Sequence, residues 1–385
     1  MSNPEAALGE NIMKGRLRKM LLASLIILVV LALGIGLYLQ HPKFGILPTG
    51  ARLERIKNSP HYTAGEFQNL VPIPPRAEGG SSLSLWLEYL FVPQARLAPA
   101  RSIPAVKTDL MTLDRDKDIV IWLGHSSYYL QLGGKRMLID PVFSSYAAPV
   151  SFVNKAFAGT NLYTAEDMPA IDYLLITHDH WDHLDYPTIS ALKPKIKQVI
   201  CGLGVGSYFE QWGFAADQIQ EADWFTAVKP ETDFTVHVLP ARHFSGRMLT
   251  RNKTLWASLA LITPARRLFF SGDSGYGPHF KQIGESFNGF DLVVVDNGQY
   301  DKNWPYVHMT PEEAVQAAGD LRAKALLPGH IGKFALAKHP WDEPLQRVTA
   351  ASRNKDYRLL TPKIGEPVEL ANEQQVFSTW WEGQR

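Results

Sequence analysis

Residues 177–185 (Thr-His-Asp-His-Trp-Asp-His-Leu-Asp) most strongly restrict what this chain can fold into. Three histidines and three aspartates lie within nine residues, directly after the apolar run Tyr-Leu-Leu-Ile at 173–176. Imidazoles and carboxylates are ligands that zinc and similar metals accept. Their spacing gives two neighbouring pairs, His178 with His180 and Asp182 with His183. We therefore predict two metal ions held side by side at a strand end, rather than a charged surface loop.

Two ions need more ligands than this stretch supplies, so other strand ends are expected to provide them. His243, Asp273 and His330 each follow a short apolar run. The glycines on either side of the Asp273 segment, Gly272 and Gly275, permit a tight turn and a close approach. Any one of these residues could be an ordinary loop residue. All of them together, in the order His-x-His-x-Asp-His, then His, Asp and His, indicate a metal site far more specifically than any one of them does.

An uncharged apolar segment occupies residues 20–39. A helix of about twenty residues rises about 30 Å, which matches the hydrocarbon core of a bilayer. Four basic residues precede it: Lys14, Arg16, Arg18 and Lys19. Positive charge next to a membrane span usually stays on the cytoplasmic side. These residues therefore predict a cytoplasmic tail at 1–19 and a catalytic domain outside the cytoplasm, on the periplasmic side in a bacterium. A cleaved signal peptide would have a shorter apolar region and a small-x-small cleavage site, and a core helix would have a polar face. We predict a single-pass signal anchor.

Residues 40–110 are rich in proline, which breaks long elements. We predict an arm that packs on a catalytic domain at 111–385. One short helix is expected at 84–91. Its aromatic residues (Trp86, Tyr89 and Phe91) are expected to pack on that domain rather than on lipid.

Short strands dominate the chain after residue 118. Apolar runs at 119–123, 128–132 and 136–140, separated by glycines, predict an antiparallel meander. Later strands are predicted at 173–176, 198–201, 235–239, 258–262, 267–271, 291–295 and 325–327. Helices are predicted near 205–212 and from Thr310, which caps a helix with Pro311 at its first position and Glu313 closing a capping box. Strands interleaved with helices predict a layered α/β domain.

Composition narrows the classes of partner and site. The 385 residues carry 39 Lys and Arg against 38 Asp and Glu, so the net charge of +1 favours no nucleic-acid partner. The single cysteine, Cys201, excludes an internal disulfide framework and a cysteine-based zinc site. No sequence feature specifies an oligomeric state.

With these residues in place, the chain resembles the metallo-β-lactamase superfamily, and within it the N-acyl phosphatidylethanolamine-hydrolysing phospholipases D and their bacterial relatives. The resemblance covers about residues 59–343. Besides 177–185, its motifs are Gly-His-Ser-Ser (124–127), Asp-Pro-Val-Phe-Ser-Ser (140–145), Pro-Ala-Arg-His-Phe-Ser (240–245), Ser-Gly-Asp-Ser-Gly-Tyr (271–276), His-Met-Thr-Pro-Glu-Glu-Ala (308–314) and Gly-His-Ile-Gly-Lys-Phe-Ala-Leu-Ala (329–337). It implies an αβ/βα four-layer sandwich, here preceded by the transmembrane helix.

The resemblance also implies a ligand set for two zinc ions. His178, His180 and His243 would hold the first ion, Asp182, His183 and His330 the second, and Asp273 would bridge them. Zinc lowers the pKa of bound water to about 7, so a bridging hydroxide could attack phosphorus at neutral pH. The implied reaction cleaves N-acyl phosphatidylethanolamine to N-acylethanolamine and phosphatidic acid. Manganese or iron could replace zinc, because imidazole and carboxylate do not select between them.

Further residues receive roles in the same scheme. Asp182 and His308 are assigned to catalysis, His308 through substrate binding or proton transfer, although it could simply pack at the helix entrance. Asp140 and Asp185 are expected to orient ligand imidazoles. His125 and His279 are expected to be structural residues near the mouth of the site.

Other functions stay open at this point. The same dimetal site could hydrolyse a lactone or another ester, because one fold hosts many chemistries. A binding module without activity is disfavoured by the intact ligand set. A nuclease would need a basic groove, which the charge balance does not indicate.

Overall fold

The computed structural model describes residues 4–74, 96–247 and 250–384. The chain divides into two compact units, Met1–Gly45 and Ile46–Arg385. The first contains helix α1 (Pro4–Leu39) and the short helix η1 (Pro42–Phe44). Within α1, Gly15–Leu39 contains an 18-residue window that has a mean hydropathy of 2.9 and is not buried, which makes it a candidate membrane span by length and composition.

The second unit contains two mixed seven-stranded sheets. In spatial order, the first holds β16 (Pro367–Glu369), β3 (Ile119–Trp122), β4 (Tyr128–Leu132), β5 (Lys135–Ile139), β6 (Ile171–Ile176), β7 (Ile196–Gly202) and β8 (Ile219–Ala222). Strands β3 to β5 pair antiparallel, which confirms the predicted meander, and β5 to β8 pair parallel. A parallel run brings the carboxyl ends of its strands to one edge of the sheet.

The other sheet also has an antiparallel part and a parallel part. Its spatial order is β15 (Arg358–Leu359), β14 (Ala325–Gly329), β13 (Leu292–Asp296), β12 (Arg267–Phe270), β11 (Ser258–Ile262), β10 (Phe234–Leu239) and β9 (Thr226–Glu231). Strands β9 to β12 are antiparallel, and β12 to β15 are parallel. The predicted strands at 235–239, 258–262, 267–271, 291–295 and 325–327 are confirmed with shifts of one or two residues at their ends.

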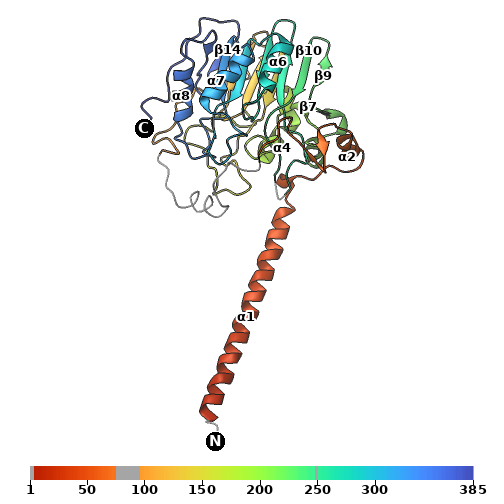
Figure 1. Ribbon diagram of the computed structural model, residues 1–385, viewed down its shortest axis with the longest axis vertical. Coiled ribbons are helices and arrows are strands. Elements are labelled where there is room, and N and C mark those ends of the chain that lie inside the picture. The colour runs from red at the N-terminus through yellow and green to blue at the C-terminus, as the bar shows by residue number, and fades with distance from the viewer. Residues whose placement is uncertain (1–3, 75–95, 248–249, 385) are drawn as a thin grey trace. The chain divides into compact units, whose positions relative to one another are not determined.

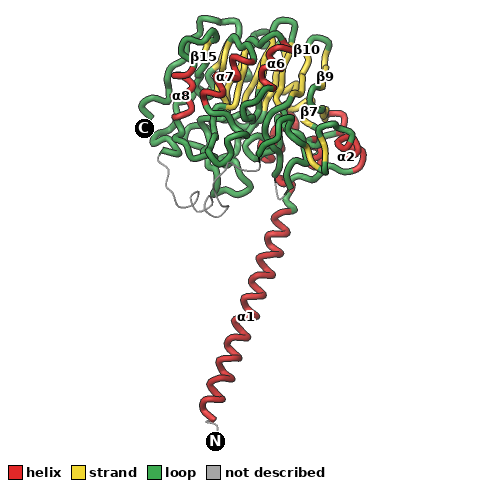
Figure 2. Tube along the Cα trace, in the orientation of Figure 1, coloured by secondary structure: helices red, strands yellow, loops and turns green. Residues whose placement is uncertain are grey.

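Helices cover the outer faces of the two sheets (Figures 1 and 2). They are α4 (Tyr186–Leu192), α5 (Gly206–Gln211), α6 (His279–Phe287), α7 (Pro311–Asp320) and α8 (Glu343–Ala351), with short helices η2 (Lys193–Lys195) and η3 (Ala216–Gln218). Apolar residues of α4 and α5 share a buried cluster with the first sheet, and those of α6, α7 and α8 share another with the second. The third and largest cluster joins the inner faces of the sheets. The predicted four-layer αβ/βα fold is confirmed.

The capping box at the start of α7 forms as predicted. The Thr310 hydroxyl accepts a hydrogen bond from the Glu313 amide at 3.4 Å, and the Glu313 carboxylate accepts one from the Thr310 amide at 2.9 Å. These bonds satisfy amide groups that the first turn of a helix leaves unpaired. Helix α5 lies inside the predicted 205–212 segment, whereas β8, β9, α4, α6 and α8 had no sequence prediction.

Part of the proline-rich arm belongs to the second unit. It forms helix α2 (Gly50–Lys57) and the two-stranded hairpin of β1 (Tyr62–Thr63) and β2 (Glu66–Phe67). Ile56 and Phe67 are fully buried in the cluster between the sheets. The helix predicted at 84–91, with Trp86, Tyr89 and Phe91, lies outside the described residues. The boundary at residues 110 and 111 stays a prediction.

Candidate metal centre

The predicted ligands lie just beyond the carboxyl ends of strands from both sheets. The residues that follow β6, β10, β12 and β14 include His178, His243, Asp273 and His330, respectively. At Gly272, φ is +57°, and an added Cβ would lie 2.8 Å from the carbonyl oxygen of Ala257. Only glycine fits there without displacement of backbone, so Gly272 allows the chain to turn into Asp273.

Four residues form a first cluster: His178, His180, His243 and Asp273, whose ligand atoms all lie within 4.8 Å of one another. Nδ1 of His180 lies 2.9 Å from Nε2 of His178 and 3.2 Å from Nε2 of His243. Oδ2 of Asp273 lies 3.7 Å from Nε2 of both His178 and His243. Three imidazoles and one carboxylate therefore converge on one point.

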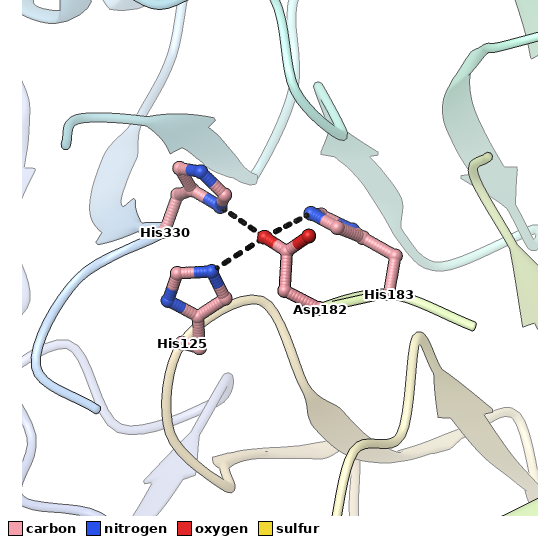
Figure 3. Close-up of side chains that lie close together, drawn as sticks. All are labelled: His125, Asp182, His183 and His330. Atoms are coloured by element: carbon pink, nitrogen blue, oxygen red, sulfur yellow. Dashed lines mark hydrogen bonds and ion pairs between the residues drawn. The ribbon is translucent and has the colours of Figure 1, made fainter. Parts of the chain in front are cut away.

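A second cluster consists of His125, Asp182, His183 and His330 (Figure 3). Oδ2 of Asp182 lies at its centre, 2.9 Å from Nε2 of His125 and 3.4 Å from Nε2 of His183. Nδ1 of His330 is 4.0 Å from the same oxygen. This cluster contains one histidine more than the three ligands that the resemblance implied.

Asp273 faces both clusters with different oxygens. Its Oδ2 points to the first cluster, whereas Oδ1 lies 3.0 Å from Nε2 of His183 and 3.1 Å from Nδ1 of His330. One carboxylate between two groups of imidazoles has the geometry expected of a bridging ligand.

Several of these polar atoms are buried without a hydrogen-bond partner among the described residues. They are Nδ1 of His125, Nε2 of His183, Nε2 of His330 and Oδ1 of Asp273. Unpaired buried polar atoms are costly, so their concentration at one place needs a cause. Metal ions are a sufficient cause for Nε2 of His183 and Oδ1 of Asp273, which face each other at the second cluster, because imidazole and carboxylate atoms satisfy their lone pairs by coordination. The residues present fit a dimetal site.

Burial keeps most of the imidazoles in their neutral, metal-binding form. It lowers the pKa of His178, His243 and His330 well below the ordinary value, and neighbouring imidazoles lower it further. His183 is the exception: burial opposes its charge, but Asp273 and Asp182 raise its pKa well above the ordinary value. A metal cation can take over that charge-balancing role when it displaces the proton.

Asp140 orients His183, as predicted. Its Oδ2 lies 2.8 Å from Nδ1 of His183 and 2.5 Å from the hydroxyl of Thr177. Asp185 does not orient an imidazole, and that prediction is wrong. Its Oδ2 instead accepts hydrogen bonds from the hydroxyls of Ser144, at 2.7 Å, and Thr188.

The loop that carries His178, His180 and His183 is tied to residues 240–257, the segment that carries His243. The carboxylate of Asp179 accepts hydrogen bonds from the Gly246 amide at 2.7 Å and the Thr254 hydroxyl at 2.9 Å. In return, Nη1 of the buried Arg247 donates to the carbonyl oxygens of Asp179 at 2.8 Å and Leu184 at 2.6 Å. Two ligand-bearing segments thus form one hydrogen-bonded unit.

His308 lies beside both clusters and is buried except for a small exposed part. Its Nδ1 is 2.8 Å from Oδ2 of Asp296, the last residue of β13, and its ring stacks on His330 with centroids 4.9 Å apart. Burial opposes its charge, but Asp296 raises the pKa of His308 above the ordinary value.

An open cleft of about 700 Å³ reaches the centre at His243 and His308. Its walls come from three segments: arm residues 66–74, residues 243–252 and residues 303–308. The walls include Phe244, Trp304 and the exposed guanidinium of Arg251, which lies 4.1 Å above the Phe244 ring. A substrate with an apolar body and an anionic group suits this lining.

Comparison with known proteins agrees with the fold and the clusters. The family model described as a beta-lactamase superfamily domain matches residues 135–331. An uncharacterized protein of Mycobacterium tuberculosis is 37% identical over 329 residues, which cover 84% of this chain and 88% of that protein. The chain belongs to the metallo-β-lactamase superfamily. It is a metal-dependent hydrolase of that superfamily, with a buried His/Asp metal-binding cluster.

Two further proteins extend the comparison. An N-acyl-phosphatidylethanolamine-hydrolyzing phospholipase D of Caenorhabditis elegans is 32% identical over 269 residues, which cover 65% of this chain and 75% of that protein. The resemblance to these phospholipases is confirmed at the level of homology. The crystal structure of an isothiocyanate hydrolase from Delia radicum gut bacteria matches 65% of this chain and 98% of its own, with a TM-score of 0.53 and 17% identity. It supports the metallo-β-lactamase fold alone.

Within this metallo-β-lactamase fold, all seven predicted ligands lie in the two clusters, and His308 adjoins them. Sequence reasoning missed His125, which was expected near the mouth but is fully buried beside Asp182. The signal was the Gly-His-Ser-Ser turn after β3. His279 is structural as expected: it is buried and lies 3.2 Å from the Ser274 hydroxyl. No described contact joins His41, His61, His237 or His339 to the clusters.

Proposed function

We propose that this metal-dependent hydrolase is a phospholipase D-type phosphodiesterase that cleaves N-acyl phosphatidylethanolamine to N-acylethanolamine and phosphatidic acid. The observation that carries the proposal is the 32% identity over 269 residues to a phospholipase D named for that substrate. The cleft adds support, because Arg251 offers a cation for a phosphate and the aromatic walls offer an apolar surface.

The ligand assignment is part of the proposal. The first ion is assigned to His178, His180 and His243, the second to Asp182, His183 and His330, and the bridge to Asp273. Two bound zinc ions would supply a water molecule of lowered pKa and positive charge for the phosphoryl oxygens. Asp140 fixes the His183 ring, and Nδ1–H of His243 donates to the carbonyl oxygen of Val307 at 2.9 Å. Both contacts leave Nε2 for a metal.

His308 supplies the proton for the leaving group. Asp296 holds Nδ1, so Nε2 is the nitrogen that can exchange a proton with a substrate in the cleft. As the water oxygen bonds to phosphorus and its proton is released to solvent, the phosphorus–oxygen bond to ethanolamine breaks, and Nε2–H of His308 protonates the departing oxygen before the ring regains a proton from solvent. Asp296 raises the pKa of His308 above its ordinary value, which favours the charged imidazole that a general acid requires.

We also propose that α1 anchors the enzyme in the membrane, with the N-terminus cytoplasmic and the hydrolase domain on the opposite side. The support is the candidate span Gly15–Leu39, whose residues 20–39 carry no charge, and the basic residues Lys14, Arg16, Arg18 and Lys19 that precede this uncharged part. Sodium carbonate extraction should leave the protein in the membrane pellet. A protease added outside spheroplasts should digest the hydrolase domain, and full protection would contradict this orientation.

Activity is tested with the purified full chain in detergent micelles that contain N-acyl phosphatidylethanolamine. The expected products are N-acylethanolamine and phosphatidic acid, identified by mass spectrometry, and H178A should abolish their formation. Free fatty acid or acylphosphoethanolamine as the product would contradict a phospholipase D reaction. A lactone substrate tested in parallel addresses the alternative, since lactone opening without phospholipid cleavage would replace the proposal.

A further inference from the structure

Asn69, on the arm, holds the backbone of the predicted metal ligand His243 from both sides. Its Nδ2 donates to the His243 carbonyl oxygen at 2.7 Å, and its Oδ1 accepts from the His243 amide at 3.0 Å. The His243 ring is held separately, by the bond from Nδ1 to the Val307 carbonyl oxygen at 2.9 Å. Backbone and ring are therefore both fixed, and Nε2 is left to face the first cluster.

The arm is also attached to residues 240–257 by the residues that precede Asn69. Before Asn69, the Phe67 amide donates to the Asn252 carbonyl oxygen at 2.8 Å, and Nζ of Lys253 donates to the Gly65 carbonyl oxygen at 2.6 Å. The Phe67 ring is fully buried in the cluster between the sheets. These contacts place Asn69 with little freedom to move.

The same arm forms one wall of the cleft. Pro72 and Ile73 line it together with His243 and His308. Asn69 lies outside the 135–331 segment that matches the superfamily domain. A segment that precedes that domain in the chain therefore contacts a predicted metal ligand directly.

We propose that Asn69 is a positioning residue for the first metal site, through which the arm sets the place of His243. The backbone amide and carbonyl of His243 are buried, and Asn69 is a partner of both. Removal of the side chain leaves two buried polar groups to find new partners, which rotates the peptide and moves Nε2. Loss of groups that orient a metal ligand typically weakens metal affinity by about 10- to 100-fold.

The test measures metal binding by the full-length protein without any lipid substrate. Apo-protein is titrated with Zn²⁺ against a chromophoric chelator, and with Co²⁺ to record its visible absorption bands. N69A should bind one of two Zn²⁺ ions at least about tenfold more weakly and should show altered Co²⁺ bands. N69D keeps the acceptor but replaces the donor by an oxygen that faces the His243 carbonyl, so it should show the same defect.

Asn58, an exposed amide residue at the end of α2 on the same arm, provides the matched control. N58A should keep wild-type affinity and wild-type Co²⁺ bands. Wild-type affinity for both Zn²⁺ ions in N69A or N69D would overturn the proposal. If N69A does not fold, N69D alone provides the test. Because no phospholipid is used, this result is independent of whether the substrate is N-acyl phosphatidylethanolamine.

Discussion

His308 and Asp296 form a buried pair in which Nδ1 of the imidazole lies 2.8 Å from Oδ2 of the carboxylate. Asp296 is almost fully buried at the end of β13, while His308 lines the cleft. An aspartate in this position fixes the tautomer and orientation of the ring and stabilises its charged form. The His308 imidazole is therefore arranged as a proton donor whose orientation and charge are set by the Asp296 carboxylate.

Replacement of Asp296 by asparagine should lower kcat on N-acyl phosphatidylethanolamine. The amide cannot stabilise the imidazolium, and a positioned acid contributes about 10²- to 10⁴-fold to such reactions. We expect a loss of about 10²-fold in kcat for D296N and for H308A, with KM changed far less. The double variant should be no slower than H308A, because both single changes remove one function. Metal content measured on the same samples should be unchanged; a loss of metal would assign the pair a structural role instead.

The pH profile gives a second prediction for this pair. Asp296 raises the pKa of His308, so the wild type keeps its charged acid to higher pH than an ordinary histidine would. Activity lost as pH rises should therefore be lost at lower pH in D296N than in the wild type. The measurement is kcat against pH from about 5 to 9. An unshifted alkaline limb in D296N would show that His308 is not the group that titrates there.

Three of the predicted metal ligands lie where parallel strands end. His178, Asp273 and His330 each follow a strand of a parallel run, and such runs bring their carboxyl ends to one edge. The rule does not apply to His243, which was predicted from the order of the ligand residues, because it follows β10 and this strand pairs antiparallel with both neighbours. Nor does it apply to His125, which follows β3, since β3 also pairs antiparallel with both neighbours. His125 reaches the site because its backbone pairs with Ile331 across the two sheets. No local pattern reports that contact.

Two other contacts between residues far apart in the chain could not be predicted from local sequence patterns either. Asp185 lies two residues after His183, which suggested a role beside the imidazoles, but helix α4 begins at Tyr186 and turns its carboxylate toward Ser144 and Thr188. The link from Asn69 to His243 joins residues 174 positions apart. Sequence periodicity reports neighbours along a helix or strand, and neither the Asp185–Ser144 contact nor the Asn69–His243 contact is of that kind.

His125 should contribute to retention of the second ion. Its Nε2 holds Asp182 at 2.9 Å, and it belongs to the same cluster as His183 and His330. H125A should weaken binding of one Zn²⁺ ion by about 10- to 100-fold and leave the other unchanged. Competition with a chelator measures both affinities. H61A, at a histidine with no described contact to the clusters, is the control, and equal affinities in H125A and wild type would show that His125 only fills space.

His279 should make the protein sensitive to acid. Burial and, to a smaller extent, the nearby Arg242 lower the pKa of His279 to about 3. In the unfolded chain the pKa is about 6.5, so the unfolded state binds more protons between these values. The stability associated with the neutral ring is complete above pH about 6.5 and is lost as pH falls toward 3. H279Q should lose less stability than wild type when urea unfolding at pH 7 and pH 5 is compared, and an identical loss would contradict the assignment.

Arg247 should be needed for a stable metal-binding loop. Its buried guanidinium donates to two carbonyl oxygens of that loop, on Asp179 and Leu184, and lies 4.0 Å above the Trp181 ring. R247M leaves both carbonyls without this charged donor, and a buried group that loses such a partner costs about 1–3 kcal/mol. We expect the free energy of unfolding to fall by about 2–4 kcal/mol for the pair of carbonyls together.

Arg251 provides the comparison, because it is an exposed arginine on the same segment that stacks on Phe244. R251M should change the free energy of unfolding by less than about 0.5 kcal/mol, as exposed substitutions usually do. R247K should lie between R247M and wild type, since an ammonium can donate to the carbonyls but has no plane to stack on Trp181. Urea unfolding of the three variants in excess Zn²⁺ gives the values. Equal destabilisation by R247M and R251M would show that the loop is held by Asp179 and its partners rather than by Arg247.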